Sequence, residues 1–246
     1  AGLTVSSFTI GTVADTAGSA MTSTTLPAPS SIFGTKTIVI DTTVPVISSV
    51  ITETSGRVNT TAVGYTLSEA IASGLATWTT TGGTSDVDSP HEAALAGSEL
   101  NQGTRSLAVL TNAPTLVDGA IYTISFTGTD VAGNEATEVS VTGITFDTTA
   151  PTIASFTTAT ATGSYNAAEA IVITANTSEA IQNGNTITVT LDTTDTVILT
   201  AASAGTTLVG TYTVGAGNTS AGLTVSSFTI GTVADTAGNA MSSTTL

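Results

Sequence analysis

The stretch DTTAPTIASF at residues 147–156 decides the organisation of the chain, because it repeats DTTVPVISSV at residues 41–50. Two further motifs follow each copy in the same order. LSEAI at 67–71 returns as TSEAI at 177–181, and DVAGNEA at 130–136 returns as DTAGNAM at 235–241. A repeat at a fixed distance indicates one structural unit per copy. The offset of 106 residues (147 − 41) matches the size of one β-sandwich domain.

The two ends of the sequence are also copies of each other. Residues 1–26 recur at 221–246, and only Ser19/Asn239 and Thr22/Ser242 differ. PAPSSIFGTKTIVI at 27–40 continues the first copy, and nothing equivalent follows the second. We therefore expect the C-terminal strands of a partial unit at 1–40, a complete unit at 41–146, and a unit without its last strand at 147–246.

Two explanations of these incomplete ends stay open. The sequence is a window from a longer repetitive polypeptide, or SIFGTKTIVI (31–40) of one chain completes the sandwich of the next. An open sheet position invites such strand addition.

The composition predicts an all-β fold. Hydrophobic residues make up 40% of the chain and charged residues only 9%, a balance that argues against disorder. Abundant Thr, Val and Ile favour strands, and apolar residues alternate with polar ones at 122–126 and 187–191. The change of parity within LTVSSFTI (223–230) predicts a bulge near Ser226 and Ser227. Only SPHEAALAG (89–97), with Ser89 as its cap, suggests a short helix in a loop.

The charge excludes several classes of function. The formal net charge is −15, and the three cations are the isolated Lys36, Arg57 and Arg105. Nucleic-acid binding and attachment to anionic membranes need clustered cations, so neither is expected, and no apolar run is long enough to insert in a membrane. The chain has no Cys, which excludes disulfides and thiolate chemistry.

No catalytic motif is present, and we expect no enzyme activity. The single His of the chain lies in an acidic loop that we expect to be a solvated face. The loop residues are Asp86, Asp88, His91 and Glu92.

The repeated acidic motifs predict metal sites. In an antiparallel seven-strand sandwich, the DTT, SEAI and D.AGN motifs all reach the same pole of their unit. Three carboxylates that meet without a nearby Lys or Arg repel one another unless a cation lies between them. Oxygen ligands without His or Cys favour Ca²⁺. The candidate ligands are Asp41, Glu69, Asp130 and Asn134 in one unit, and Asp147, Glu179, Asp235 and Asn239 in the next.

Simpler roles are available for each motif alone. D.AGN suits a hairpin turn, Glu after a strand is often solvated, and DTT.P suits an extended linker. These roles do not explain why the three carboxylates recur together.

With these motifs in fixed order, the chain resembles the bacterial immunoglobulin-like repeats of giant surface adhesins and of S-layer-type or biofilm-associated proteins. The resemblance implies tandem Ig-like antiparallel β-sandwich modules that form an elongated rod, stiffened by Ca²⁺ near the module junctions. It also implies a secreted protein at the cell surface, with neighbouring copies as partners and host or matrix glycans or proteins as further partners. Asp15 matches Asp235, but its unit lacks the other motifs and Ser19 replaces the Asn.

Two functions follow from these features. The first is a structural or adhesive segment of a repetitive extracellular filament, with Ca²⁺ at its junctions and strand exchange between subunits as one route of assembly. The alternative is a glycan-binding or accessory module of a secreted enzyme. That alternative needs exposed aromatic residues, whereas aromatics are 4% of the chain and we expect Trp78, the only Trp, to be buried.

Overall fold

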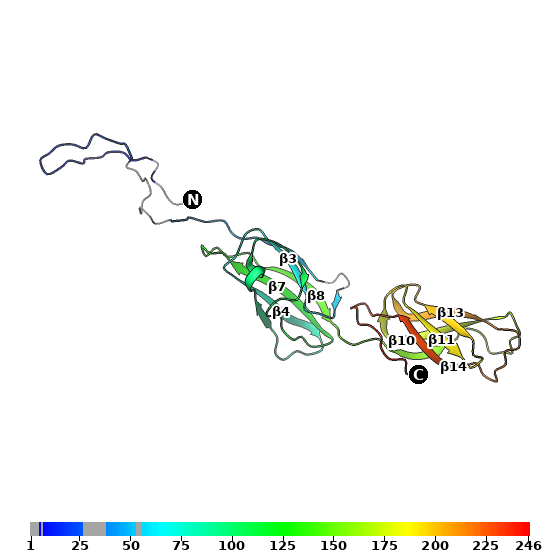
Figure 1. Cartoon of the computed structure of the whole chain (residues 1–246). Coiled ribbons are helices and arrows are strands. Elements are labelled where there is room, and N and C mark those ends of the chain that lie inside the picture. The colour runs from blue at the N-terminus through cyan, green and yellow to red at the C-terminus, as the bar shows by residue number, and fades with distance from the viewer. Residues whose placement is uncertain (1–4, 6, 27–37, 53–55) are drawn as a thin grey trace.

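The computed structural model describes residues 5, 7–26, 38–52 and 56–246. They form an all-β fold, as the composition predicts, with one short 3₁₀-helix at Gly97–Leu100 among the described residues. Figure 1 shows two groups of strands end to end. We refer to residues 41–146 as the first unit and to residues 147–246 as the second unit. Their identity as tandem Ig-like modules, and the predicted boundaries, remain predictions.

The first unit contains two sheets. One has the order β1-β3-β6 and the other the order β2-β8-β7-β4-β5; all pairs are antiparallel except β2 with β8. The strand bounds are β1 Ile47–Ile51, β2 Arg57–Val58, β3 Val63–Leu67, β4 Ser73–Gly83, β5 His91–Ala94, β6 Gly103–Ala108, β7 Ala120–Thr129 and β8 Val139–Phe146.

The second unit has one antiparallel sheet of order β14-β11-β12-β13-β10-β9. Read in chain order, its strands match β1, β3, β4, β5, β6 and β7 of the first unit, so β8 has no counterpart among its described strands. The bounds are β9 Ile153–Thr157, β10 Ala170–Ile181, β11 Thr186–Leu191, β12 Thr196–Thr200, β13 Gly205–Thr213 and β14 Val225–Thr232.

Each unit has its own hydrophobic core, and the two clusters of buried residues share no member. Along β7, Tyr122, Ile124 and Phe126 are buried while the residues between them are partly exposed. This alternation is what a strand with one face on the core requires. Trp78 is buried in the first core, as expected, and Tyr65 lies beside Phe126 with ring centroids 5.0 Å apart.

The predicted helix at 89–97 is wrong. The segment forms the strand β5, which pairs with β4 from Trp78 opposite His91 to Leu75 opposite Ala94. Ladder hydrogen bonds and the complete burial of Ala93 outweigh the weak local helix signal. The Ser89 hydroxyl accepts a hydrogen bond from the Thr80 backbone N–H instead of capping a helix.

The predicted bulge in β14 is confirmed. Thr190 lies opposite Ser227, and the next residue, Leu191, lies opposite Val225, so Ser226 is the extra residue.

The two copies of the repeated 26-residue sequence have different environments. Val233 and Met241 are 3% and 5% exposed, whereas their counterparts Val13 and Met21 are 50% and 47% exposed. The described part of the N-terminal copy forms a single isolated bridge, between Ala14 and Ala20. Of the predicted strand 31–40, residues 31–37 lie outside the described residues, and 38–40 are exposed.

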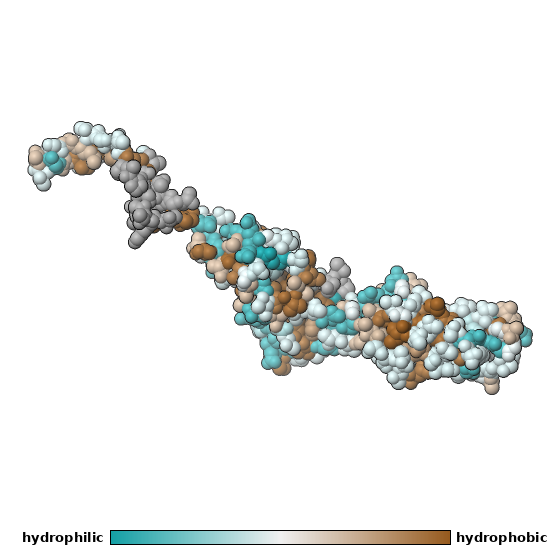
Figure 2. Space-filling model, viewed as in Figure 1, coloured by the Kyte–Doolittle hydropathy of each residue, from teal (hydrophilic) through white to brown (hydrophobic). Residues whose placement is uncertain are grey.

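The described surface is mostly pale in Figure 2, with scattered brown apolar patches. The pale colour reflects a composition rich in residues of near-neutral hydropathy. Within the described residues, no helix has the length and apolar character needed to cross a membrane.

Candidate metal sites at the unit poles

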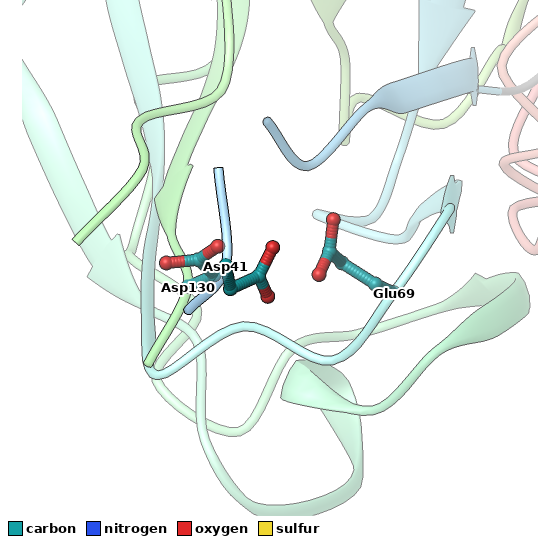
Figure 3. A group of neighbouring side chains, drawn as sticks. All are labelled: Asp41, Glu69 and Asp130. Carbon is teal, nitrogen blue, oxygen red and sulfur yellow. The ribbon is translucent and has the colours of Figure 1, made fainter. Parts of the chain in front are cut away.

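The structure brings the six predicted carboxylates together as two triplets. Asp41, Glu69 and Asp130 form the first-unit triplet, shown in Figure 3. The second-unit triplet, which lies at the junction of the two units, is formed by Asp147, Glu179 and Asp235. In each triplet, one carboxylate oxygen of every residue lies within 4.8 Å of the others.

Corresponding elements position the two triplets. Asp41 precedes β1 and Asp147 precedes β9, each as the first residue of its unit. Glu69 follows β3, while Glu179 lies near the end of the matching strand β10. Asp130 directly follows β7, and Asp235 follows β14 by a few residues. β1 and β3 are antiparallel neighbours, as are β9 and β10, while β7 and β14 stand outside those pairs. The three motifs of each unit nevertheless meet at one place, as predicted.

The D.AGN turn holds its Asp in place through the Asn of the motif. The Asn134 backbone N–H donates to Asp130 Oδ1 at 2.8 Å, and the Asn134 side-chain amide donates to Asp130 Oδ2 at 2.8 Å. The hydrogen bond from the Asn134 side chain is the main reason that the pKa of Asp130 lies below its ordinary value. Gly133 has a φ of +94°, a left-handed conformation that glycine adopts readily.

The same Asn side chains join the turn to the start of the unit. Asn134 Nδ2 donates to the Asp41 backbone carbonyl at 3.2 Å, and Asn239 Nδ2 donates to the Asp147 backbone carbonyl at 2.8 Å. Asn239 also donates to Asp235 Oδ2, and its own oxygen accepts from Asn59. Both Asn residues therefore position the carboxylates, and none of these contacts supports their predicted role as metal ligands.

The second-unit triplet is the more deeply buried of the two. Asp147 and Asp235 are 6% and 1% exposed, whereas in the first-unit triplet Asp130 is 4% exposed and Asp41 is not buried. Burial raises the pKa of Glu179, and the charges of Asp147 and Asp235 raise it further. The raised pKa means that the protein environment resists ionisation of Glu179 beside the other two acids.

A cation that the motifs did not predict lies at this junction. Arg57 Nη1 is 2.9 Å from Asp147 Oδ2, so the expectation of a triplet without a nearby Arg is wrong for the second unit. Arg57 begins β2 in the first unit, outside every repeated motif. One guanidinium beside three carboxylates still leaves an excess of negative charge.

Other first-unit side chains bind the segment that joins the units. Asp118 accepts hydrogen bonds from the Thr148 backbone N–H and hydroxyl and from the Thr149 hydroxyl. These bonds lower the pKa of Asp118. Asn59 Nδ2 donates to Asn239 Oδ1 at 3.1 Å, which connects the first unit to the D.AGN turn of the second.

Arg57, Asn59 and Asp118 were missed by sequence reasoning because none belongs to a repeated motif. The scarcity of cations in the chain was the only signal that could have drawn attention to Arg57.

The acidic loop around His91 is only partly solvated. The Asp86 side chain is 1% exposed, accepts a hydrogen bond from the Tyr122 hydroxyl at 2.6 Å and lies 2.6 Å from His91 Nε2. The expectation of a solvated face holds for Asp88 and Glu92 and is wrong for Asp86. The hydrogen bond between Tyr122 and Asp86 connects the loop to β7.

Comparisons with known proteins give no match: no protein-family model, no curated protein and no solved structure is significantly similar to this chain.

Proposed function

We propose that this chain is a structural segment of a repetitive extracellular cell-surface fibre, built of tandem Ig-like sandwiches whose junctions Ca²⁺ stiffens. The observation that carries the proposal is the recurrence of one carboxylate triplet at the same place in both units. A turn role explains only the Asp of D.AGN, and a solvated position explains only the Glu. A cation shared by all three acids would explain why they meet in both units.

The residues available suit Ca²⁺ better than other metals. Ca²⁺ takes six to eight oxygen ligands in a flexible arrangement, and both triplets offer only carboxylate oxygens. Asp41, Glu69 and Asp130 would hold one ion, and Asp147, Glu179 and Asp235 would hold the other. Neither triplet contains the His or Cys ligands that zinc sites commonly use.

The junction contacts support a mechanical role for the second ion. Asp147 lies directly after β8 of the first unit, while Glu179 and Asp235 belong to the second. An ion shared by these residues would connect the end of one unit to the pole of the next. Without it, the repulsion among the three acids opposes that arrangement, and Arg57 offsets part of the repulsion.

The glycan-binding alternative has no observation in its favour. It needs exposed aromatic residues, whereas Trp78 and Tyr65 are each 1% exposed within the first core.

Thermal unfolding of the full chain in millimolar Ca²⁺ and in chelator tests the proposal. At 100 times the dissociation constant, binding adds about 2.7 kcal/mol per site to the folded state. The variants Glu69→Gln and Glu179→Gln should each lose part of the Ca²⁺-dependent rise in Tm. Glu138→Gln, at an exposed position outside both triplets, is the matched control and should keep the full rise. Equal melting curves with and without Ca²⁺ would overturn the proposal.

A further inference from the structure

A guanidinium group distinguishes the second-unit triplet from the first-unit triplet. Arg57 Nη1 lies 2.9 Å from Asp147 Oδ2, whereas the described residues contain no ion pair to any acid of the first-unit triplet. Asp147 Oδ1 accepts a further hydrogen bond, from the Thr149 backbone N–H at 3.2 Å. Both oxygens of the Asp147 carboxylate are therefore engaged by other groups of the protein.

Strand pairing sets the position of Arg57. β2 runs parallel to the end of β8, with Arg57 opposite Thr145 and Val58 opposite Phe146. The backbone N–H of Asp147 then donates to the Val58 carbonyl at 2.9 Å. The ladder thus places Arg57 beside Asp147, at the point where the chain passes into the second unit.

The charge of Arg57 acts beyond Asp147. Burial raises the pKa of Glu179, and the charges of Asp147 and Asp235 raise it further, while the charge of Arg57 lowers it. A nearby cation favours the ionised form of an acid. Arg57 therefore stabilises negative charge at the place where the proposed function puts Ca²⁺.

An ion bound to this triplet would share Asp147 with Arg57. Two cations beside one carboxylate repel each other, and the repulsion is stronger where burial limits screening by water. Asp147 and Asp235 are both buried, so this condition is met. The Arg57 side chain is 49% exposed, so its guanidinium group has access to solvent when an ion takes its place.

The junction keeps other contacts when Arg57 leaves Asp147. The Asn59 side chain donates to Asn239 Oδ1, and Asp118 accepts hydrogen bonds from Thr148 and Thr149. None of these bonds uses a carboxylate of the triplet. Exchange of Arg57 for an ion therefore leaves the two units joined.

We propose that Arg57 is an internal counter-ion of the junction, which neutralises part of the second-unit triplet when Ca²⁺ is absent and competes with Ca²⁺ for Asp147. The inference rests on the Ca²⁺ part of the proposed function and refines it, because it names a residue that sets the affinity of one triplet. Its consequence is a junction that Ca²⁺ fills only at concentrations high enough to displace Arg57.

Calorimetric titration of the full chain with Ca²⁺ tests the competition. Glu69→Gln weakens the first-unit triplet, so binding in this background reports on the second-unit triplet. There, Arg57→Gln should lower the Ca²⁺ dissociation constant about tenfold, as expected when one adjacent positive charge is removed. Arg57→Lys keeps the charge and should restore most of the original value. Arg105→Gln is the matched control without effect, because it removes the same charge at a residue that donates to the Asn101 carbonyl, outside both triplets.

Thermal unfolding separates this role from a purely structural one. In chelator, Arg57→Gln should lower the Tm, because the three acids lose their counter-ion. In saturating Ca²⁺ the loss should shrink, because the ion takes over that role. A loss of Tm that is equal in both conditions, with an unchanged dissociation constant, would overturn the inference.

The possible results of the titration separate this inference from the proposed function. Ca²⁺ binding that Arg57→Gln leaves unchanged overturns the inference alone. Binding at the second-unit triplet that begins only after Arg57→Gln supports the inference and contradicts a Ca²⁺-filled junction in the unmodified chain. No Ca²⁺ binding by the unmodified chain or by any variant overturns both.

Discussion

At the scale of single residues, the Asn of D.AGN contributes more than a turn conformation. Its amide connects the turn Asp to the backbone of the first residue of the unit, in both units. Asp15, in the N-terminal copy, keeps its bonds from the backbone N–H groups of Ala17 and Ser19. The turn therefore needs only Asp and the backbone, while the link to the unit start needs Asn.

Asn134→Ala removes this link and leaves the buried Asp130 with fewer donors. We expect a loss of about 2 kcal/mol in the free energy of unfolding, because hydrogen bonds to a charged group are worth more than neutral ones. Urea denaturation followed by Trp78 fluorescence measures it. Asn101→Ala, at an exposed position of the same unit, is the control and should change stability little. Equal stability of the two variants would contradict the positioning role.

Glu179 gives a pH-dependent prediction. Its pKa in the folded state is raised above the ordinary value of 4.5, chiefly by burial and then by the charges of Asp147 and Asp235. The folded state therefore binds more protons than the unfolded state between 4.5 and that raised pKa. Stability contributed by this group is complete below 4.5 and is lost as pH rises through the folded pKa.

In chelator, the stability of the Glu179→Gln variant should fall less as the pH rises, because the variant lacks the ionisation of Glu179. The variant should therefore be more stable than the unmodified chain at neutral pH. In Ca²⁺ the order should reverse, because the ion favours the ionised Glu179 that the variant lacks. Chemical denaturation from pH 4 to pH 8 in both conditions measures the difference. A variant that is less stable than the unmodified chain at neutral pH in chelator would contradict this account.

At the scale of elements, alternation and repeats predict the strands well, and the exceptions have local causes. Tyr122, Ile124 and Phe126 face the core as their spacing requires, and the parity change in β14 marks a real bulge. The helix at 89–97 was wrong because pairing with β4 is a tertiary contact that no local pattern reveals. The meeting of the acids could be predicted from the strand topology of the repeated motifs. Arg57, Asn59 and Asp118 could not, because they lie at the junction but belong to no repeated motif.

The identical sequence of β14 and the N-terminal segment allows a matched test of strand context. A Cβ at Gly231 would lie 2.5 Å from the Thr186 hydroxyl and 2.9 Å from the Thr186 carbonyl oxygen, whereas a Cβ at Gly11 meets nothing within 4 Å. We expect Gly231→Ala to destabilise the second unit by about 1–3 kcal/mol, the usual cost of overpacking. Gly11→Ala should leave calorimetric unfolding unchanged. Equal effects of the two changes would contradict the pairing of β14 with β11.

At the scale of the whole molecule, one short connection that begins with Asp147 joins the first unit to the second. Figure 1 shows the two units end to end, and the connection between them carries the Asp118 bonds and the Arg57–Asp147 ion pair. Such contacts are partly exposed, and exposed ion pairs contribute little stability on their own. We therefore expect the stiffness of the junction to depend on what neutralises the second-unit triplet.

The most direct measurement is small-angle X-ray scattering of the full chain, extrapolated to low concentration, in millimolar Ca²⁺ and in chelator. The account predicts an extended particle with a narrow distribution of shapes in Ca²⁺, and a shorter average dimension with a broader distribution in chelator. Glu179→Gln should show a smaller difference between the two conditions than the unmodified chain. Scattering curves that superimpose with and without Ca²⁺ would contradict a junction stiffened by the ion.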